Sequence, residues 1–236
     1  MHPRLRQVVL LTNDLDSALA EARELFGFTG GVRDPQGMAD LGFEHEVLTF
    51  TDTCLEIIAP LDPESSFSKL AASGVGGYMT VVQVPNLNEF IERAEKREIR
   101  PVMHVDYEGQ DLSQWHPKDV GTLAEFDQIE PPESWHFAPG VFEHQATGVA
   151  TNIAGVTLSV KDPAKMAEQW GYLTNQPHEQ TSIMLADGPV TFIPFDDGPR
   201  GLRVVELFAA DPARVGEVMT LCGVEFRLVA PKGELV

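Results

Sequence analysis

Two glutamates stand inside apolar, strand-like segments of this 236-residue chain. Glu56 lies within Cys54-Leu55-Glu56-Ile57-Ile58, and Glu125 lies within Thr122-Leu123-Ala124-Glu125-Phe126. A carboxylate that a strand carries into an apolar pocket has a perturbed pKa, and Arg or Tyr partners could hold it there as a pocket acid without a metal. These two residues are therefore the first candidates for chemistry, and the elements around them must position them.

The composition limits the kind of partner. The chain has 17 basic and 36 acidic side chains, a net charge of −19. Nucleic acids and anionic membrane surfaces both require clustered Lys and Arg, so neither is an expected partner, and we expect a small-molecule ligand or substrate instead.

The sequence also predicts the compartment. No apolar run approaches the roughly 18–20 residues of a membrane span, and the N-terminal residues lead directly into a strand rather than a signal peptide. The two cysteines, Cys54 and Cys222, match no metal or redox spacing. We therefore expect a cytoplasmic protein whose thiols are buried.

A strand-like segment followed by a helical pattern occurs four times. The predicted strands cover residues 8–12, 80–84, 156–160 and 204–208, and the predicted helices cover 15–26, 87–94, 163–170 and 212–219. Each helix follows an Asn or Asp that can accept the free N–H groups of the first turn. These capping residues are Asn13 or Asp14, then Asn86, Asp162 and Asp211.

Further strand-like segments follow each helix, among them residues 46–50, 54–58 and 122–126. The repeated unit is thus a strand, a helix and two or three antiparallel strands. Because one unit cannot bury both its sheet face and its helix, the units should pair. A proline-rich stretch separates the pairs, which predicts a domain at 1–128, a connector at 129–151 and a shorter second domain at 152–236.

Paired units of this kind, with Asn13-Asp14-Leu15-Asp16 after the first strand and Leu55-Glu56-Ile57 in the closing strand, resemble the vicinal oxygen chelate superfamily. Its members include glyoxalase I, methylmalonyl-CoA epimerase, bleomycin-resistance proteins and extradiol dioxygenases. The segment from His116 to Glu125 is similar to the epimerase-like turn before the last metal-ligand strand. The resemblance covers residues 5–127 and, more weakly, 152–229. It implies an α+β fold of paired βαβββ modules in open, cup-shaped mixed sheets, with two tandem domains of which the second is abbreviated.

The resemblance also implies a divalent metal inside the cup, with ligands from the first and last strands of each unit. The four ligand positions fall on Gln7, Glu56, Met79 and Glu125. A thioether is a poor ligand for hard or borderline divalent ions, so Met79, which replaces a family His, departs from the ligand pattern of the superfamily. The remaining set Gln7, Glu56 and Glu125 favours Mg²⁺ or Mn²⁺ over Zn²⁺, with Ni²⁺ and Fe²⁺ also candidates.

Three histidines could replace the missing ligand from a neighbouring strand: His45, His104 and His116. His104 and His116, together with Met79, are the residues that we expect to line the pocket. The aromatic connector, with Trp135, Phe137 and Phe142, could cover a core or lie over the mouth of the cup as a lid.

Two functions remain open. In the first, the protein is a metal-assisted isomerase or lyase in which the metal stabilises an enolate and Glu56 or Glu125 takes the proton. In the second, it is a metal-free binding protein similar to bleomycin-resistance proteins, since Met79 makes the pocket apolar and the negative charge favours a cationic ligand. A dioxygenase is disfavoured because the two-His-one-carboxylate iron set is not at these positions.

The C-terminal pair has Gly155 and Val204 at its first-strand ligand positions, and neither can hold a metal. Its last closing strand is expected to be missing. We expect this half to support the first domain, complete the fold or form a homodimer interface.

Overall fold

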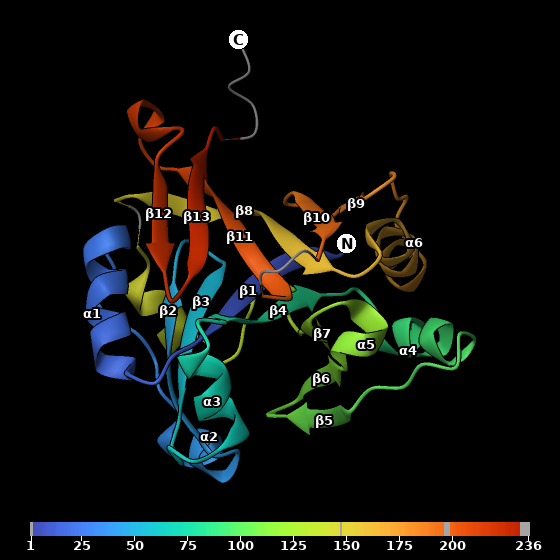
Figure 1. The fold of residues 1–236 in the computed structure, drawn as a ribbon, viewed down its shortest axis with the longest axis horizontal. Helices are drawn as coiled ribbons and strands as arrows, with labels where there is room; N and C mark the ends of the chain where they lie inside the picture. Colours follow the sequence, from blue (N-terminus) through green and yellow to red (C-terminus); the bar gives the residue numbers. More distant parts are fainter. Residues whose placement is uncertain (1, 147, 196–198, 232–236) are drawn as a thin grey trace.

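The computed structural model describes residues 2–146, 148–195 and 199–231. These residues form two mixed sheets, of seven and six strands, with helices at their sides (Figure 1). This confirms the α+β fold of paired βαβββ modules.

The first half of the seven-stranded sheet comes from the first unit. Its elements are β1 (Arg4–Leu11), α1 (Leu15–Phe26), α2 (Pro35–Asp40), β2 (Phe43–Thr49), β3 (Cys54–Pro60) and α3 (Ser66–Ala72). The second unit contributes β4 (Gly77–Gln83), α4 (Leu87–Glu95), β5 (Met103–Tyr107), β6 (Gln110–Trp115), α5 (Pro117–Val120) and β7 (Leu123–Gln128).

The strand order is β2-β3-β1-β4-β7-β6-β5. Within each unit the first strand pairs in parallel with the closing strand, β1 with β3 and β4 with β7. The units then join through antiparallel pairing of β1 with β4. The closing strands that carry Glu56 and Glu125 therefore flank the centre of one curled sheet.

The six-stranded sheet repeats this arrangement. It contains β8 (Ala150–Val160), α6 (Pro163–Thr174), β9 (Ser182–Met184), β10 (Pro189–Pro194), β11 (Gly201–Ala209), the 3₁₀ turn η2 (Pro212–Arg214), β12 (Val218–Leu221) and β13 (Val224–Val229). Its order is β12-β13-β11-β8-β10-β9, with β8 and β11 antiparallel at the centre.

Two expectations for the fourth unit are wrong. The helix predicted over residues 212–219 is only the short turn η2, and Val218 and Met219 belong to β12 instead. Val218 is 58% exposed, so the apolar spacing in this segment marks no buried helix face. The closing strand is also present, because β13 pairs in parallel with β11 as β3 does with β1.

The capping residues start the other helices as predicted. Asp14, Asn86 and Asp162 accept backbone N–H groups of the first turns of α1, α4 and α6. Of the two alternatives for α1, the N-cap is Asp14, whose carboxylate accepts the N–H of Ser17. A side-chain oxygen at this position satisfies an N–H group that has no partner within the helix.

The two sheets share one hydrophobic core. Phe26 of α1 packs against Phe226 of β13, and Phe126 of β7 packs against Trp170 of α6. The approach is closest at Gly76, where an added Cβ would lie 1.5 Å from the backbone oxygen of Cys222. No helix in the described part of the chain is long and apolar enough to cross a membrane.

Candidate functional site

The other face of the seven-stranded sheet is concave, and strand register brings the two predicted carboxylates to it. Val9 pairs with Glu56, and Val81 pairs with Glu125. Val9, Val81 and Met79 all belong to an apolar cluster on this side. Directly paired residues share a face of a sheet, so Glu56 and Glu125 point into the same hollow.

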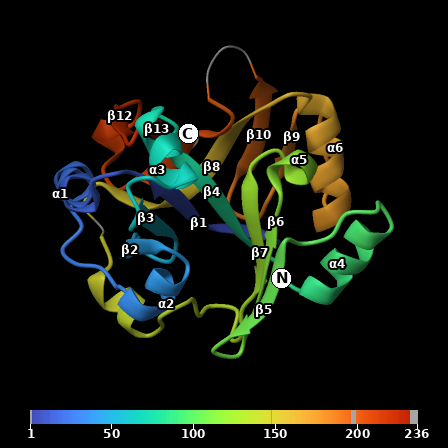
Figure 2. The same ribbon diagram turned by 60° about the horizontal axis from the view of Figure 1, so that its bottom comes forward.

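The connector covers this hollow. Ile129, Trp135 and Val141 are buried in the cluster of the concave face. Figure 2, which brings this side forward, shows the yellow connector passing from β7 toward α2. Of the two alternatives for the connector, the burial of these side chains favours covering a core.

Two consecutive residues of β1 hold the connector in place. The N–H of the Trp135 indole donates a 2.9 Å hydrogen bond to Gln7 Oε1. The guanidinium of Arg6 lies 4.5 Å from the centre of the Trp135 ring and donates to the backbone oxygen of Ser134. The strand register shifts between Leu5 and Gln7, and this irregularity allows both Arg6 and Gln7 to reach the connector. Burial lowers the pKa of Arg6 to about 10.

Glu56 is held by two donors. Gln7 Nε2 donates to one of its oxygens at 2.8 Å, and His45 Nδ1 lies 2.6 Å from the other. The backbone N–H of Asp34 donates to His45 Nε2, so the ring proton is on Nδ1 and His45 donates to Glu56. Both Glu56 oxygens therefore have a hydrogen-bond partner.

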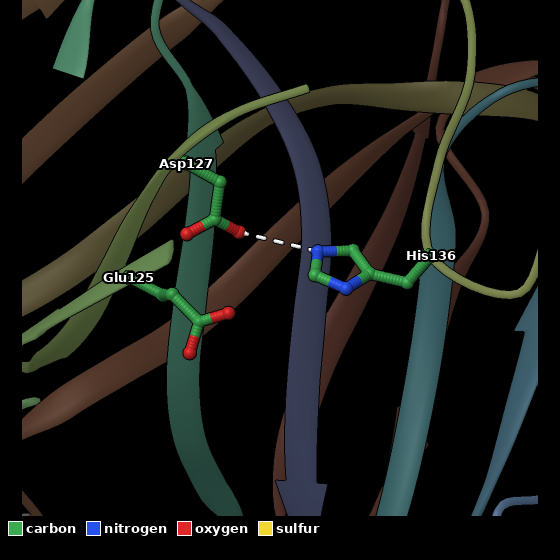
Figure 3. Close-up of side chains that lie close together, drawn as sticks. All are labelled: Glu125, Asp127 and His136. Atoms are coloured by element: carbon green, nitrogen blue, oxygen red, sulfur yellow. Dashed lines mark hydrogen bonds and ion pairs between the residues drawn. The ribbon is translucent and has the colours of Figure 1, made fainter. Parts of the chain in front are cut away.

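Around Glu125 the arrangement is different. Asp127 follows two residues later on β7, and His136 of the connector faces both carboxylates (Figure 3). One ligand atom from each of the three lies within 4.8 Å of the other two. His136 Nε2 is 3.4 Å from Asp127 Oδ2, and Gln114 Nε2 donates to Glu125 Oε2 at 2.8 Å. The three side chains converge on one point.

Burial makes this group electrostatically unfavourable when both carboxyls are ionised. Desolvation, and then the charge of Asp127, raise the pKa of Glu125 well above its usual value. Desolvation likewise raises the pKa of Asp127, which is fully buried. Burial lowers the pKa of His136, against the opposing charges of Glu125 and Glu56. A proton or a bound cation would remove the repulsion.

The ligand set implied by the superfamily fits this geometry poorly. The Gln7 and Glu56 side chains hydrogen-bond to each other and to Trp135 and His45, and Met79 lies in the apolar cluster. The group Glu125, Asp127 and His136 does fit a divalent cation. It combines two carboxylates with an imidazole, and only small movements would bring the ligand atoms to the roughly 2.0–2.2 Å metal–ligand distances of such sites.

The structure places His104 and His116 away from the hollow, contrary to the expectation that they line the pocket. His104 pairs with Ser113, on the face opposite Gln114 and Glu125, and contacts Asp111. His116 is exposed at the start of α5, where its Nδ1 accepts the N–H of Lys118. His45 is the histidine that reaches the predicted site.

Sequence reasoning missed Asp127 and His136. Asp127 had a usable signal, because residues two apart on a strand share a face and Glu125 was already a candidate. His136 had none, since it approaches through a connector with no periodic pattern.

The second sheet carries no comparable group. Its closing-strand positions, by the register that places Glu56 opposite Val9, are Thr191 opposite Thr157 and Arg227 opposite Glu206. Among the described residues, only Glu125, Asp127 and His136 gather as possible metal ligands.

The model of a glyoxalase-like domain matches residues 8–174 of the chain. The chain therefore belongs to the glyoxalase-like domain family, within the vicinal oxygen chelate superfamily. Proteins of this superfamily often use divalent metals, and the structure contains a group of side chains suited to one.

Solved structures are similar in fold. A hypothetical protein from Staphylococcus aureus superposes with a TM-score of 0.69 at 12% identity, covering 97% of this chain and 100% of that one. Methylmalonyl-CoA epimerase from Mycobacterium tuberculosis gives 0.46 at 22% identity, covering 54% of this chain and 88% of that one. A methylmalonyl-CoA epimerase in complex with methylmalonyl-CoA and NH4+ gives 0.46 at 20% identity, covering 57% and 100%. The comparison with curated proteins gives no significant match.

Proposed function

We propose that the concave face of the N-terminal sheet is the active site of a divalent-cation-assisted isomerase or lyase that acts on a small carbonyl compound. Glu125, Asp127 and His136 would hold the cation. The observation that carries the proposal is the convergence of two buried carboxylates and one imidazole within 4.8 Å. Buried carboxylates that repel each other gain stability from a cation between them.

A cation at this position would supply a Lewis acid for an enolate oxygen of the substrate. The proton acceptor would be Glu56, which points into the same hollow and is not one of the three proposed ligands. The hydrogen bonds from Gln7 and His45 fix the orientation of its carboxylate. The buried Trp135, which donates to Gln7, would help to exclude water, and this would strengthen electrostatic interactions in the site.

The proposed ligands change the expected metal. An imidazole with two carboxylates suits Mn²⁺, Fe²⁺ or Zn²⁺ better than Mg²⁺, which prefers an all-oxygen shell.

Calorimetric titration of chelator-treated protein with Mn²⁺ and Zn²⁺ tests the cation site. We expect one ion per chain, with affinity at least tenfold weaker in Asp127→Asn and His136→Gln. Glu56→Gln should bind as the wild type does, and Asp111→Asn is the matched control, since Asp111 lies on the opposite face with His104. The absence of binding, or equal affinity in Asp127→Asn, would rule out this site.

The proton step has a separate test. Carbonyl compounds with an acidic C–H group can be screened by NMR for cation-dependent exchange of that hydrogen with deuterated solvent. Glu56→Gln should abolish the exchange while leaving the cation bound. If exchange persists in Glu56→Gln, Glu56 is not the proton acceptor.

A metal-free binding protein is the second candidate function. It is favoured by the apolar position of Met79 and by the hydrogen-bonded Gln7–Glu56–His45 network, which needs no ion. Thermal-shift measurements against cationic and anionic small molecules test it, with stabilisation by cationic ligands in the presence of chelator as the expected result. Stabilisation by divalent metals alone would contradict it.

A further inference from the structure

A groove between the two halves of the chain has a charge opposite to that of the whole protein. It has a volume of about 1090 Å³ and is bordered by α5, α6 and the ends of α4 and β8. Its lining includes five basic side chains, Arg97, Lys118, Lys161, Lys165 and Arg200, and His116. The acidic side chains in the lining are Asp119 and Asp162.

The ratio of basic to acidic residues in the groove is the reverse of the ratio in the whole chain. The groove holds five of the 17 Lys and Arg residues but only two of the 36 Asp and Glu residues. One of these two is already engaged, because Asp162 accepts the backbone N–H of Lys165 as the N-cap of α6. The local charge is therefore positive on a strongly negative molecule.

Among the described residues, the three lysines of the groove have no ion-pair partner, whereas Arg200 lies 4.3 Å from the centre of the Phe195 ring. In the part of the chain that the structure describes, no ion pair joins Lys118, Lys161, Lys165 or Arg200 to a carboxylate of another residue. Ammonium groups of this kind are common binders of phosphate. Arg97 is already fixed, since it donates to Gln169 and Glu168 and lies over the Tyr172 ring.

The floor of the groove is apolar and tightly packed. It includes Ile99, Val160 and Met166. Gly121 ends α5 with a φ of 84°, and a Cβ there would lie 2.7 Å from Val160 Cγ1. The absence of a side chain at Gly121 thus lets α5 approach β8, and the basic groups stand around a floor that is already formed.

We propose that this groove binds a small molecule that carries a diphosphate or two neighbouring phosphates. The volume of about 1090 Å³ is slightly above the usual range of small-molecule sites, about 300–1000 Å³, and leaves room for two phosphate groups and the body of a small molecule. The net charge of −19 opposes a nucleic acid, whose long backbone would extend over the acidic surface beyond the groove. The groove is separate from the concave face, because His116, the exposed N-cap of α5, lies away from the hollow that holds Glu125.

Calorimetric titration with inorganic pyrophosphate at low ionic strength tests the proposal. Pyrophosphate also binds divalent ions, so all measurements use chelator-treated protein and metal-free buffer. We expect one site per chain, an affinity for pyrophosphate at least tenfold higher than for orthophosphate, and weaker binding as salt increases.

Variants locate the site. Lys161→Ala/Lys165→Ala should weaken pyrophosphate binding at least tenfold, and Lys118→Ala at least threefold. The matched control is Lys69→Ala/Lys96→Ala, which removes two lysines outside the groove and should change the affinity less than twofold. Asp127→Asn, which should lose the proposed cation site, should still bind pyrophosphate with the wild-type affinity. The groove and the cation site are therefore tested independently. No binding by the wild type, equal affinity for both phosphates, or equal losses in the groove and control variants would overturn the proposal.

Discussion

The indole of Trp135 donates a 2.9 Å hydrogen bond to the side-chain oxygen of Gln7, and so joins the connector to the first strand of the sheet that it covers. Both groups are buried, with Trp135 2% and Gln7 8% exposed. The contact links the cover of the hollow directly to the residue that holds Glu56.

Truncation of Trp135 tests how strongly the connector is held. Trp135→Ala should lower the free energy of unfolding by about 3–5 kcal/mol, because it removes a large buried side chain. Trp135→Phe should cost less, about 1–3 kcal/mol, mainly because Gln7 Oε1 loses its donor. Urea denaturation measures both. No measurable loss in Trp135→Phe would show that the hydrogen bond contributes nothing to stability, and equal losses in the two variants would contradict the expected cost of removing the ring.

Asp127→Asn should change how stability depends on pH in the metal-free protein. Asp127 and Glu125 both have raised pKa values in the folded state. Their contribution to the free energy of unfolding is therefore fully present below the ordinary carboxyl pKa values, near 4. It is lost as pH rises toward the folded-state values, by about 1.4 kcal/mol for each pKa unit of difference. Asp127→Asn removes one charge of the pair, so its stability relative to wild type should increase as pH rises.

Unfolding curves collected between roughly pH 5 and pH 8 measure this difference directly, because this range lies above the ordinary carboxyl pKa. Asp16→Asn serves as control, since the Asp16 side chain is 94% exposed on α1, outside the buried group. A stability difference for Asp127→Asn that stays constant with pH would contradict the raised pKa values.

Asn152 ties the second sheet to the first. Its Oδ1 accepts hydrogen bonds from the backbone N–H groups of Asp52 and Thr53 and from the Thr53 hydroxyl. Asn152→Ala leaves these donors without their acceptor and should lower the free energy of unfolding by about 1–3 kcal/mol. Asn152→Asp keeps the acceptor and should lose less. Thermal or urea denaturation that ranks the two variants in the opposite order would refute this role.

The contact at Gly76 should tolerate no side chain. An added Cβ would meet the backbone oxygen of Cys222 at 1.5 Å, so Gly76→Ala must push the two sheets apart. Gly140 is the matched control, because an added Cβ there meets nothing within 4 Å. We expect Gly76→Ala to lose several kcal/mol, as overpacked sites do, while Gly140→Ala stays within about 1 kcal/mol of wild type. Similar melting temperatures for the two variants would contradict the close approach.

The fold could be predicted because its signals are local. Asp14, Asn86 and Asp162 mark helix starts by their own side chains, and the flanking apolar patterns mark strands and helices. The fourth unit misled this reasoning, since Asp211 and Pro212 open a turn as readily as a helix. Only the tertiary pairing of β12 with β13 distinguishes the two.

The site could be predicted only in part, because it depends on contacts between distant segments. The resemblance to the superfamily predicted that Glu56 and Glu125 meet in one cup, and the strand pairing places both on one face. The sequence could not show that His45 and Gln7 would occupy both oxygens of Glu56, or that the connector would bring His136 to Asp127. Those contacts follow from the path of an irregular segment across the sheet, which no repeat in the sequence encodes.

The shared core also has a consequence for folding. The C-terminal sheet has no ligating side chains at its equivalent positions, yet Phe226 and Trp170 complete the packing of Phe26 and Phe126. Deleting this half would strip the covering from the back of the sheet that carries Glu125. Because both sheets contribute side chains to one core, we expect that neither half folds without the other.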